Sequence, residues 1–213
     1  MYVMLFTRPD ICHAVGLLSR YQMNHGPEHW KQIRNTLGYV KGIMAYFFSG
    51  HNLQLQGFTN ADWQGNLDER KSTSGYMFTL AGGAISWSSK KKDSVALPSM
   101  EAEYISTSEA VKQGVWLKEF LAFLGVVESI SFPVTIFCDN EAAIKVSKDP
   151  KFHRKTKHIE RRYRYIRDIV NRLRTTRLDY LPSVDMVVDP LTKPPSQEVF
   201  CKHVCNMGLR LWN

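Results

Sequence analysis

The apolar positions change their spacing along the chain, and this spacing predicts which segments are helices and which are strands. Over residues 7–47, apolar residues recur every three or four positions, which predicts two helices separated by Gly26-Pro27. The spacing then becomes two, which predicts strands over 53–62, 75–80 and 84–88. Because the turns between these strands are short, we expect an antiparallel three-strand meander.

The second half of the chain alternates helical and strand patterns. The predicted order is a long helix that ends at Gly125, a buried strand, a helix, a basic helix, a strand and a core helix, over 99–124, 134–138, 139–146, 151–177, 178–181 and 184–191. Strands that alternate with helices in this way predict an α/β fold with a mixed sheet and helices on its faces.

Composition narrows the class of protein. The chain has 213 residues, of which 44% are hydrophobic and 23% charged, so it is long and apolar enough to bury a core. No stretch reaches the ~20 apolar residues that a membrane helix needs, and the first residues lack the basic and small-residue features of a signal peptide. Four cysteines are too few for a disulfide scaffold, so we expect a reducing compartment and a cytoplasmic location.

The positive charge is concentrated in one segment. The net charge is +8, yet Lys151 to Arg177 alone contains eleven basic and two acidic residues, a net +9 that leaves −1 for the rest of the chain. An ordinary solvated helix face mixes both signs. A dense stripe of one sign favours a polyanionic partner, and nucleic acid ahead of a membrane surface.

Acidic residues stand at predicted element ends that meet near a common centre. Asp139 follows the buried strand, Glu101 and Glu103 lie in the first turn of the long helix, and Asp189 lies in the last predicted helix. Convergent carboxylates suit Mg²⁺, and two such ions about 3.5–4 Å apart can cleave a phosphodiester. Spacing alone leaves capping and helix-dipole roles equally open.

A second group of potential ligands is Cys201-Lys-His203-Val-Cys205. Its spacing matches no common zinc pattern, and we interpret it as part of a C-terminal amphipathic helix.

Several motifs together resemble one known family. They closely resemble the ribonuclease H domain of copia-type retrotransposon Pol polyproteins, and the resemblance covers essentially the whole chain in order. The motifs are Arg70-Lys-Ser-Thr-Ser-Gly75-Tyr, Ile85-Ser-Trp-Ser-Ser-Lys90-Lys, Met100-Glu-Ala-Glu-Tyr104, Cys138-Asp-Asn140, Lys155-Thr-Lys-His-Ile-Glu160 and Asp189-Pro-Leu-Thr-Lys-Pro194. Thr7-Arg-Pro-Asp-Ile-Cys12 and Gly26-Pro-Glu-His-Trp30 resemble the tail of the reverse transcriptase that precedes this domain.

The resemblance implies a fold and a domain organisation. It implies a ribonuclease H-like mixed five-stranded sheet, built from the antiparallel meander plus two parallel strands and flanked by helices. We expect residues 1–50 to be the helical tail of the reverse transcriptase, 51–195 the ribonuclease H-like domain, and 196–213 a C-terminal helical tail.

The resemblance also implies a site. The family hydrolyses the RNA strand of RNA–DNA hybrids with two Mg²⁺ ions, for which Mn²⁺ can substitute, held by four carboxylates. The second matches Glu101, with Glu103 in a supporting role about 200° away on the helix. The third matches Asp139 and the fourth Asp189. The first position is Asn60, where the family has aspartate.

Asn60 changes the expected activity. An amide keeps the shape and one oxygen ligand but lacks the negative charge that holds the metals. Asp62 lies on the same strand face but ~6.6 Å further along, too far to take the place of an aspartate at 60. We therefore expect a domain that folds and binds hybrid but is catalytically weak or inactive.

Basic residues are expected to bind the phosphates of an RNA–DNA hybrid through backbone contacts, which carry no sequence information. They are Lys90, Lys91, Lys155, Lys157, His158, Arg161 and Arg162. No Tyr-x-Asp-Asp-like strand occurs, so we expect the polymerase site of such polyproteins to lie upstream of this chain. In the family the location is a virus-like particle or the nucleus. A non-catalytic nucleic-acid-binding module and a non-functional relic of a truncated element remain the alternatives.

Overall fold

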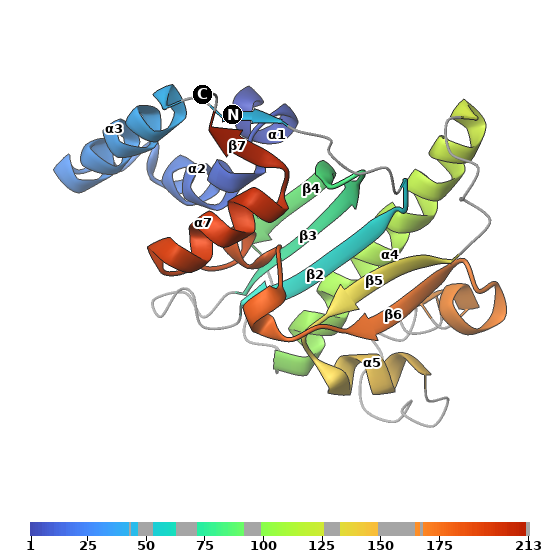
Figure 1. Cartoon of the computed structure of the whole chain (residues 1–213). Helices are drawn as coiled ribbons and strands as arrows, with labels where there is room; N and C mark the ends of the chain where they lie inside the picture. The colour runs from blue at the N-terminus through green and yellow to red at the C-terminus, as the bar shows by residue number, and fades with distance from the viewer. Residues whose placement is uncertain are drawn as a thin grey trace.

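A mixed five-stranded sheet forms the centre of the protein (Figure 1). The computed structural model describes residues 1–42, 44–46, 53–62, 72–91, 99–125, 133–148, 165–166 and 168–211. The strand order is β4-β3-β2-β5-β6, with β2 to β4 antiparallel and β5 and β6 added in parallel to β2. The strands are β2 (Gln56–Asp62), β3 (Thr73–Leu80), β4 (Gly83–Lys91), β5 (Val134–Cys138) and β6 (Thr176–Tyr180). The predicted mixed α/β fold with a three-strand meander is therefore confirmed.

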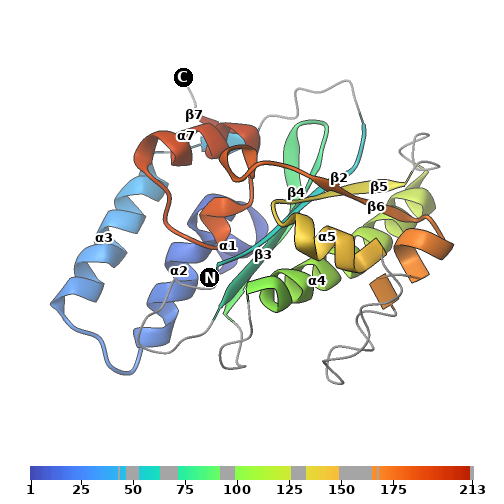
Figure 2. The ribbon, with the colours of Figure 1, turned by 90° about the horizontal axis from the view of Figure 1, so that it is seen from below.

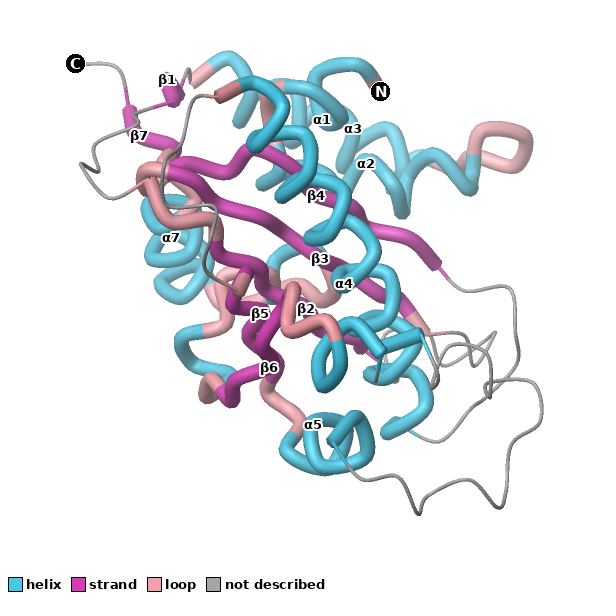
Figure 3. The backbone as a smooth tube through the Cα atoms, turned by 90° about the vertical axis from the view of Figure 1, so that its right-hand side faces the viewer, coloured by secondary structure: helices cyan, strands magenta, loops and turns pink. Residues whose placement is uncertain are grey.

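Helices cover both faces of this sheet, as the view in Figure 2 shows. One face carries α4 (Ser99–Leu124) and α5 (Glu141–Lys148), and Figure 3 shows α4 lying over the strands. The other side carries α7 and the N-terminal helices. These are α1 (Tyr2–Phe6), α2 (Cys12–Leu18), α3 (Pro27–Lys41) and α7 (Gln197–Asn206). Short turns of helix complete the fold: η1 (Pro9–Ile11), η2 (Ser19–Tyr21), η4 (Asp168–Arg172), η5 (Ser183–Asp185) and η6 (Asp189–Leu191).

Alternation along the strands divides the core into two layers. In β3 the neighbours Met77 and Phe78 are both fully buried but on opposite faces. Phe78 packs with Ile136 in the cluster under α4, whereas Met77 packs with Leu191 and Met207 in the cluster under the terminal segments. A strand that is buried on both faces needs apolar residues at consecutive positions, as Met77 and Phe78 are in β3.

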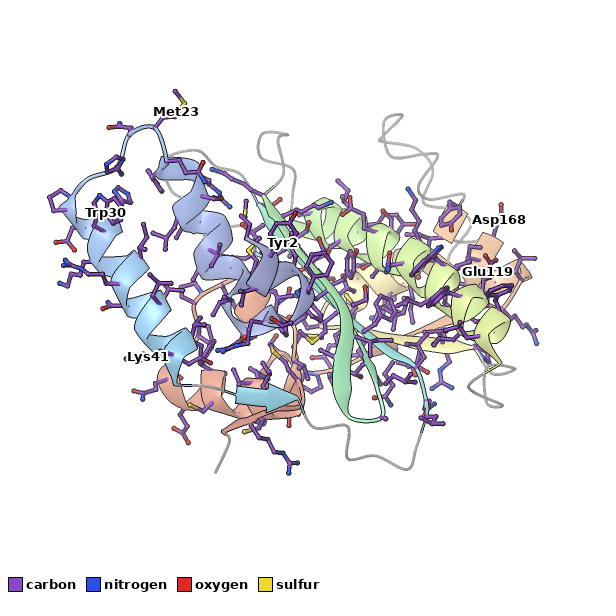
Figure 4. The ribbon with its side chains drawn as sticks, turned by 90° about the horizontal axis from the view of Figure 1, so that it is seen from above. Tyr2, Met23, Trp30, Lys41, Glu119 and Asp168 are labelled. Carbon is purple, nitrogen blue, oxygen red and sulfur yellow. The ribbon has the colours of Figure 1, made fainter. Side chains whose placement is uncertain are left out.

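The N-terminal segment is packed into the second of these layers. Met4, Ile11 and Cys12 are buried in it, and the indole Nε1 of Trp87 donates a hydrogen bond of 2.8 Å to the backbone oxygen of Met4. A short strand, β1 (Met44–Tyr46), pairs antiparallel with β7 (Leu209–Leu211), which joins the segment after α3 to the C-terminal segment. By contrast, α2 and α3 project away from the sheet, with Met23 and Trp30 exposed at their outer end (Figure 4).

Two predicted helices differ from the structure. The helix expected up to residue 47 ends at Lys41, and β1 begins three residues later. The core helix expected over 184–191 is instead the pair of short turns η5 and η6. Pro190 explains this second difference, because proline inside a helix removes a backbone donor and clashes with the preceding turn.

Much of the predicted basic helix falls on residues 149–164, outside the described part of the chain. Among the helices that are described, none has the length and apolar character required to cross a membrane.

Candidate functional site

Asn60 and Asp189 meet at the centre of the fold. Asn60 lies in β2 and is 3% exposed, and Asp189 opens η6 and is 4% exposed. The side-chain Nδ2 of Asn60 donates a hydrogen bond of 2.5 Å to Oδ1 of Asp189, and the backbone N–H of Ala61 donates one of 2.7 Å to Oδ1 of Asn60. Two of the four predicted site positions are therefore in direct contact.

Close packing against β3 holds η6, and with it Asp189, in place. A Cβ added to Gly75 would lie 2.8 Å from the side chain of Thr192 and 3.3 Å from that of Leu191, so only glycine lets the turn approach this closely. The hydroxyl of Ser89 in β4 also donates a hydrogen bond of 2.6 Å to the backbone oxygen of Leu191. The predicted motif that contains Gly75 thus positions the fourth acidic residue.

Glu103 brings a third acidic side chain to the same place. The hydroxyl of Ser106, one turn further along α4, donates hydrogen bonds to the backbone oxygens of Asn60 and Gly75, at 2.9 and 3.1 Å. These bonds fix the helix over β2 and β3. Glu103 lies on the same side of α4 as Ser106 and is only 6% exposed.

The environment of Glu103 favours its neutral form. Burial first, and then the negative charges of Asp139 and Asp189, raise the pKa of this carboxyl to about 8, although the backbone N–H of Ala61 and the ammonium of Lys193 act to lower it. Its Oε2 atom is buried without a hydrogen-bond partner. A glutamate that merely complemented the helix dipole would have a lowered pKa, so this interpretation does not apply to Glu103.

Asp139 lies beside Glu103 at the end of β5. Carboxylate oxygens of both residues and Sγ of Cys138 lie within 4.8 Å of one another. The hydroxyl of Ser183 donates a hydrogen bond of 2.7 Å to Oδ2 of Asp139. The helix that follows is capped by Asn140, whose Oδ1 accepts the backbone N–H of Ala143, so Asp139 does not serve as its cap.

Lys193 supplies the positive charge of the site. Its Nζ lies 2.7 Å from Oδ2 of Asp189 and is half-buried. Burial lowers the pKa of Lys193, but the hydrogen bond and the charge of Asp189, followed by the charges of Asp139 and Asp62, raise it overall. Lys193 belongs to the family motif that begins at Asp189, but no role for it was predicted from the sequence. Its position four residues after Asp189 is the signal that could have indicated this contact.

These residues fit a hard divalent cation. The buried Oε2 of Glu103 lacks a hydrogen-bond donor, which is the state expected of an oxygen that binds a cation. Carboxylate oxygens from Glu103 and Asp139 are also the ligand type that Mg²⁺ and Mn²⁺ prefer.

The structure describes only some of the remaining predicted site residues. Glu101 belongs to α4, but its side chain lies outside the described part, as do Lys155, Lys157, His158, Arg161 and Arg162. Lys90 and Lys91 end β4, with Lys90 exposed and Lys91 half-buried. Their proposed roles, and that of Glu101, stay predictions.

The residues of Cys201-Lys-His203-Val-Cys205 are separated by α7. Cys201 and Cys205 are exposed, whereas His203 is fully buried on the opposite side of the helix. The segment is therefore an amphipathic helix, as its sequence predicts.

Transposon polyproteins are among the known proteins with similar sequences. The Retrovirus-related Pol polyprotein from transposon TNT 1-94 of Nicotiana tabacum is 41% identical over 211 residues, which make up 97% of this chain and 16% of the polyprotein. The corresponding polyprotein from transposon RE2 of Arabidopsis thaliana is 36% identical over 198 residues, 92% of this chain and 13% of the polyprotein. The chain thus spans only a small part of these relatives. No protein-family model matches it.

A solved structure shares the fold. The foamy viral protease-reverse transcriptase, solved in complex with RNA/DNA hybrid, matches 92% of this chain with a TM-score of 0.53 and 14% identity, over 25% of its own length. The sequence matches show that the chain belongs to the copia-type retrotransposon Pol polyproteins, and the order of its five strands shows that it has the ribonuclease H-like fold.

Proposed function

We propose that this domain binds RNA–DNA hybrids and holds a divalent cation at Glu103 and Asp139, near Asp189, and that hydrolysis of the RNA strand is impaired by Asn60. The observation that carries the proposal is the buried, unpartnered Oε2 of Glu103 beside the carboxylate of Asp139. A buried acid without a donor is costly to the fold, and a cation-binding role explains why it is there.

We assign the second carboxylate position to Glu103. Two positions two residues apart on an α-helix are about 200° apart, so only one of positions 101 and 103 can face this edge of the sheet. The hydrogen bond from Ser106 to β2 orients α4 so that the helix face carrying Glu103 points toward Asn60 and Asp139. In this proposal Glu103 has a direct role in cation binding, in place of the supporting role that the sequence motif suggested.

Each residue of the site would have a separate task. Glu103 and Asp139 would hold the cation, Ser183 would fix the Asp139 carboxylate through its hydroxyl, and Lys193 would balance the charge of Asp189. When bound, a divalent cation lowers the pKa of water and stabilises negative charge on a phosphodiester oxygen. Asn60 contributes no charge and turns its NH₂ group toward Asp189, which weakens cation binding at this corner.

The RNA–DNA hybrid is the substrate class that the family implies. The related foamy viral enzyme was solved with an RNA/DNA hybrid, and Lys90 and Lys91 end a strand of the sheet that carries the site. Contacts from lysine to phosphates would be independent of sequence and sensitive to salt.

A cleavage assay tests the catalytic part of this proposal. The native chain and Asn60→Asp are incubated with a labelled hybrid in Mg²⁺ or Mn²⁺, with Glu103→Gln as the control that lacks a site carboxylate. We expect Asn60→Asp to cleave at least tenfold faster than the native chain. Native turnover equal to that of Asn60→Asp would contradict the impairment.

The second candidate function is a non-catalytic nucleic-acid-binding module, which the neutral Asn60 favours. Binding of an uncleavable hybrid over a series of salt concentrations tests it. Affinity at low salt that falls steeply with added salt supports the module, whereas no affinity at low salt leaves only the relic.

A further inference from the structure

The carboxylate of Asp189 has both of its oxygens engaged by groups of the protein itself. Oδ1 accepts a hydrogen bond from Asn60, and Oδ2 pairs with the ammonium of Lys193 at 2.7 Å. Asp189 is almost completely buried, so an ion pair here is screened less by solvent than a pair on the surface. In this arrangement Asp189 differs from Glu103, whose Oε2 has no partner.

Lys193 also interacts with more than one acidic residue. Besides Asp189, the charges of Asp139 and Asp62 favour its protonated form, and its own charge in turn acts on Glu103. The ammonium therefore lies among the same carboxylates that would attract a cation, and it competes with a cation for them.

The net charge of the site is consistent with fewer divalent metal ions than the two that the family uses. Four carboxylates carry a charge of −4, which two divalent ions neutralise. In this chain the four positions carry three carboxylates once a cation displaces the proton of Glu103, namely Glu103, Asp139 and Asp189, and Lys193 adds one positive charge. The resulting −2 is neutralised by one divalent ion.

We propose that the ammonium of Lys193 takes the place of a metal ion at one oxygen of Asp189, while the amide of Asn60 engages the other oxygen. This domain then binds a single divalent ion, at Glu103 and Asp139. This inference rests on the proposed function, because it assumes that Glu103 and Asp139 bind a cation. Lys193 is thus a positioning residue that sets how many ions the site holds and how tightly the first one binds.

A titration with Mn²⁺ tests this inference without measuring activity. Free Mn²⁺ is followed by its electron paramagnetic resonance signal in the native chain, in Lys193→Met and in Lys145→Met. Lys145 is the matched control, because it also pairs with an acidic residue four positions away, Glu141, but on the exposed surface of α5. Lys193→Gln serves as a second variant if Lys193→Met folds poorly by circular dichroism.

We expect one Mn²⁺ per native chain, about tenfold tighter binding in Lys193→Met, and no change in Lys145→Met. A second equivalent of Mn²⁺ is expected when Lys193→Met is combined with Asn60→Asp. Two equivalents in the native chain, or unchanged affinity in both variants at Lys193, would overturn the inference and leave the proposed function standing. Absence of Mn²⁺ binding in every variant would overturn the proposed function as well.

Discussion

The side-chain amide of Asn60 donates a hydrogen bond to the carboxylate of Asp189, although the two residues are 129 positions apart in the sequence. Both ends of the amide are used, since its oxygen accepts the backbone N–H of Ala61. An aspartate at position 60 could keep the second bond but could not make the first as a carboxylate. Asn60 therefore stabilises an arrangement of the site that does not depend on a cation.

Replacement of Asn60 by aspartate should couple stability to metal. Without metal, Asn60→Asp sets two buried carboxylates against each other and removes a hydrogen bond, and we expect it to lower the free energy of unfolding by about 1–3 kcal/mol. Mg²⁺ at millimolar concentration should restore most of this loss. Thermal unfolding with EDTA and with Mg²⁺ measures both effects, and the exposed Asn35→Asp is the control. Equal melting temperatures of Asn60→Asp in the two conditions would contradict the expectation.

Glu103 should make the metal-free protein less stable as pH rises. Its pKa is about 8 in the folded chain against an ordinary value of 4.5, so between these two pH values the folded state binds more protons than the unfolded state. The stabilising contribution of this group is complete below pH 4.5 and is lost as pH rises through 8. Glu103→Gln, which stays neutral, should remove this part of the pH dependence and be the more stable form at pH 9.

Denaturant unfolding in EDTA from pH 5 to pH 9 measures the effect of Glu103. The control is Glu119→Gln, an exposed position of the same helix, which should leave the profile unchanged. Parallel profiles of the native chain and Glu103→Gln would contradict the prediction, because the burial of the carboxyl would then have no energetic consequence.

The sequence was sufficient to predict the sheet but not the face of α4. The two-residue alternation of β2, β3 and β4 reflects local backbone geometry, so the sequence alone predicts these strands. The apolar run of β5 likewise predicts a strand, and it places Asp139 directly after the strand end. In the motif Glu101-Ala-Glu103, by contrast, the helix position alone does not decide which glutamate faces the sheet. That choice depends on hydrogen bonds from Ser106 to β2 and β3, which are tertiary contacts.

The pattern of apolar residues also failed to predict the turn that carries Asp189. Over 184–191 this pattern suits a helix, and the structure forms two short turns because Pro190 interrupts a helix and because Gly75 lets η6 pack directly on β3. The contact between Lys193 and Asp189 follows from this turn, and the pattern of apolar residues did not predict it.

Gly75→Ala should therefore disturb the site as well as the core. The added methyl group would have to displace the side chains of Thr192 and Leu191, which flank the turn that begins at Asp189. We expect a loss of about 1–3 kcal/mol in the free energy of unfolding and weaker Mn²⁺ binding. Gly38→Ala is the control, because a Cβ there meets no atom within 4 Å and alanine favours the helix. Native Mn²⁺ affinity in Gly75→Ala would show that the turn does not position the site.

The N-terminal segment should unfold together with the sheet. The carboxylate of buried Asp10 accepts hydrogen bonds from Arg8, at 2.8 Å from Nε and 2.7 Å from Nη2, and one of 2.7 Å from the hydroxyl of Tyr39. Asp10→Ala leaves the Arg8 guanidinium buried without its carboxylate, which we expect to cost about 3–5 kcal/mol. Tyr39→Phe, which removes one hydrogen bond, should cost about 1 kcal/mol.

Unfolding of the Asp10 variant is followed by circular dichroism and by tryptophan fluorescence. The exposed pair of Asp185 and Lys202 provides the control, and Asp185→Ala should cost less than about 1 kcal/mol. Coincident transitions are expected for both probes. A separate early transition in Asp10→Ala, with the sheet as stable as before, would show that residues 1–42 fold as a unit of their own.

His203 should limit the stability of the protein at acidic pH. It is fully buried in α7, both of its ring nitrogens are buried without a hydrogen-bond partner, and burial lowers its pKa below the ordinary 6.5. The unfolded chain therefore takes up a proton at a higher pH than the folded chain does, and stability is lost as pH falls below 6.5. His203→Leu fills a similar volume without a titratable group and should raise the melting temperature more at pH 5 than at pH 8. The exposed His25→Leu is the control. A gain that is equal at both pH values would mean that His203 acts through packing alone.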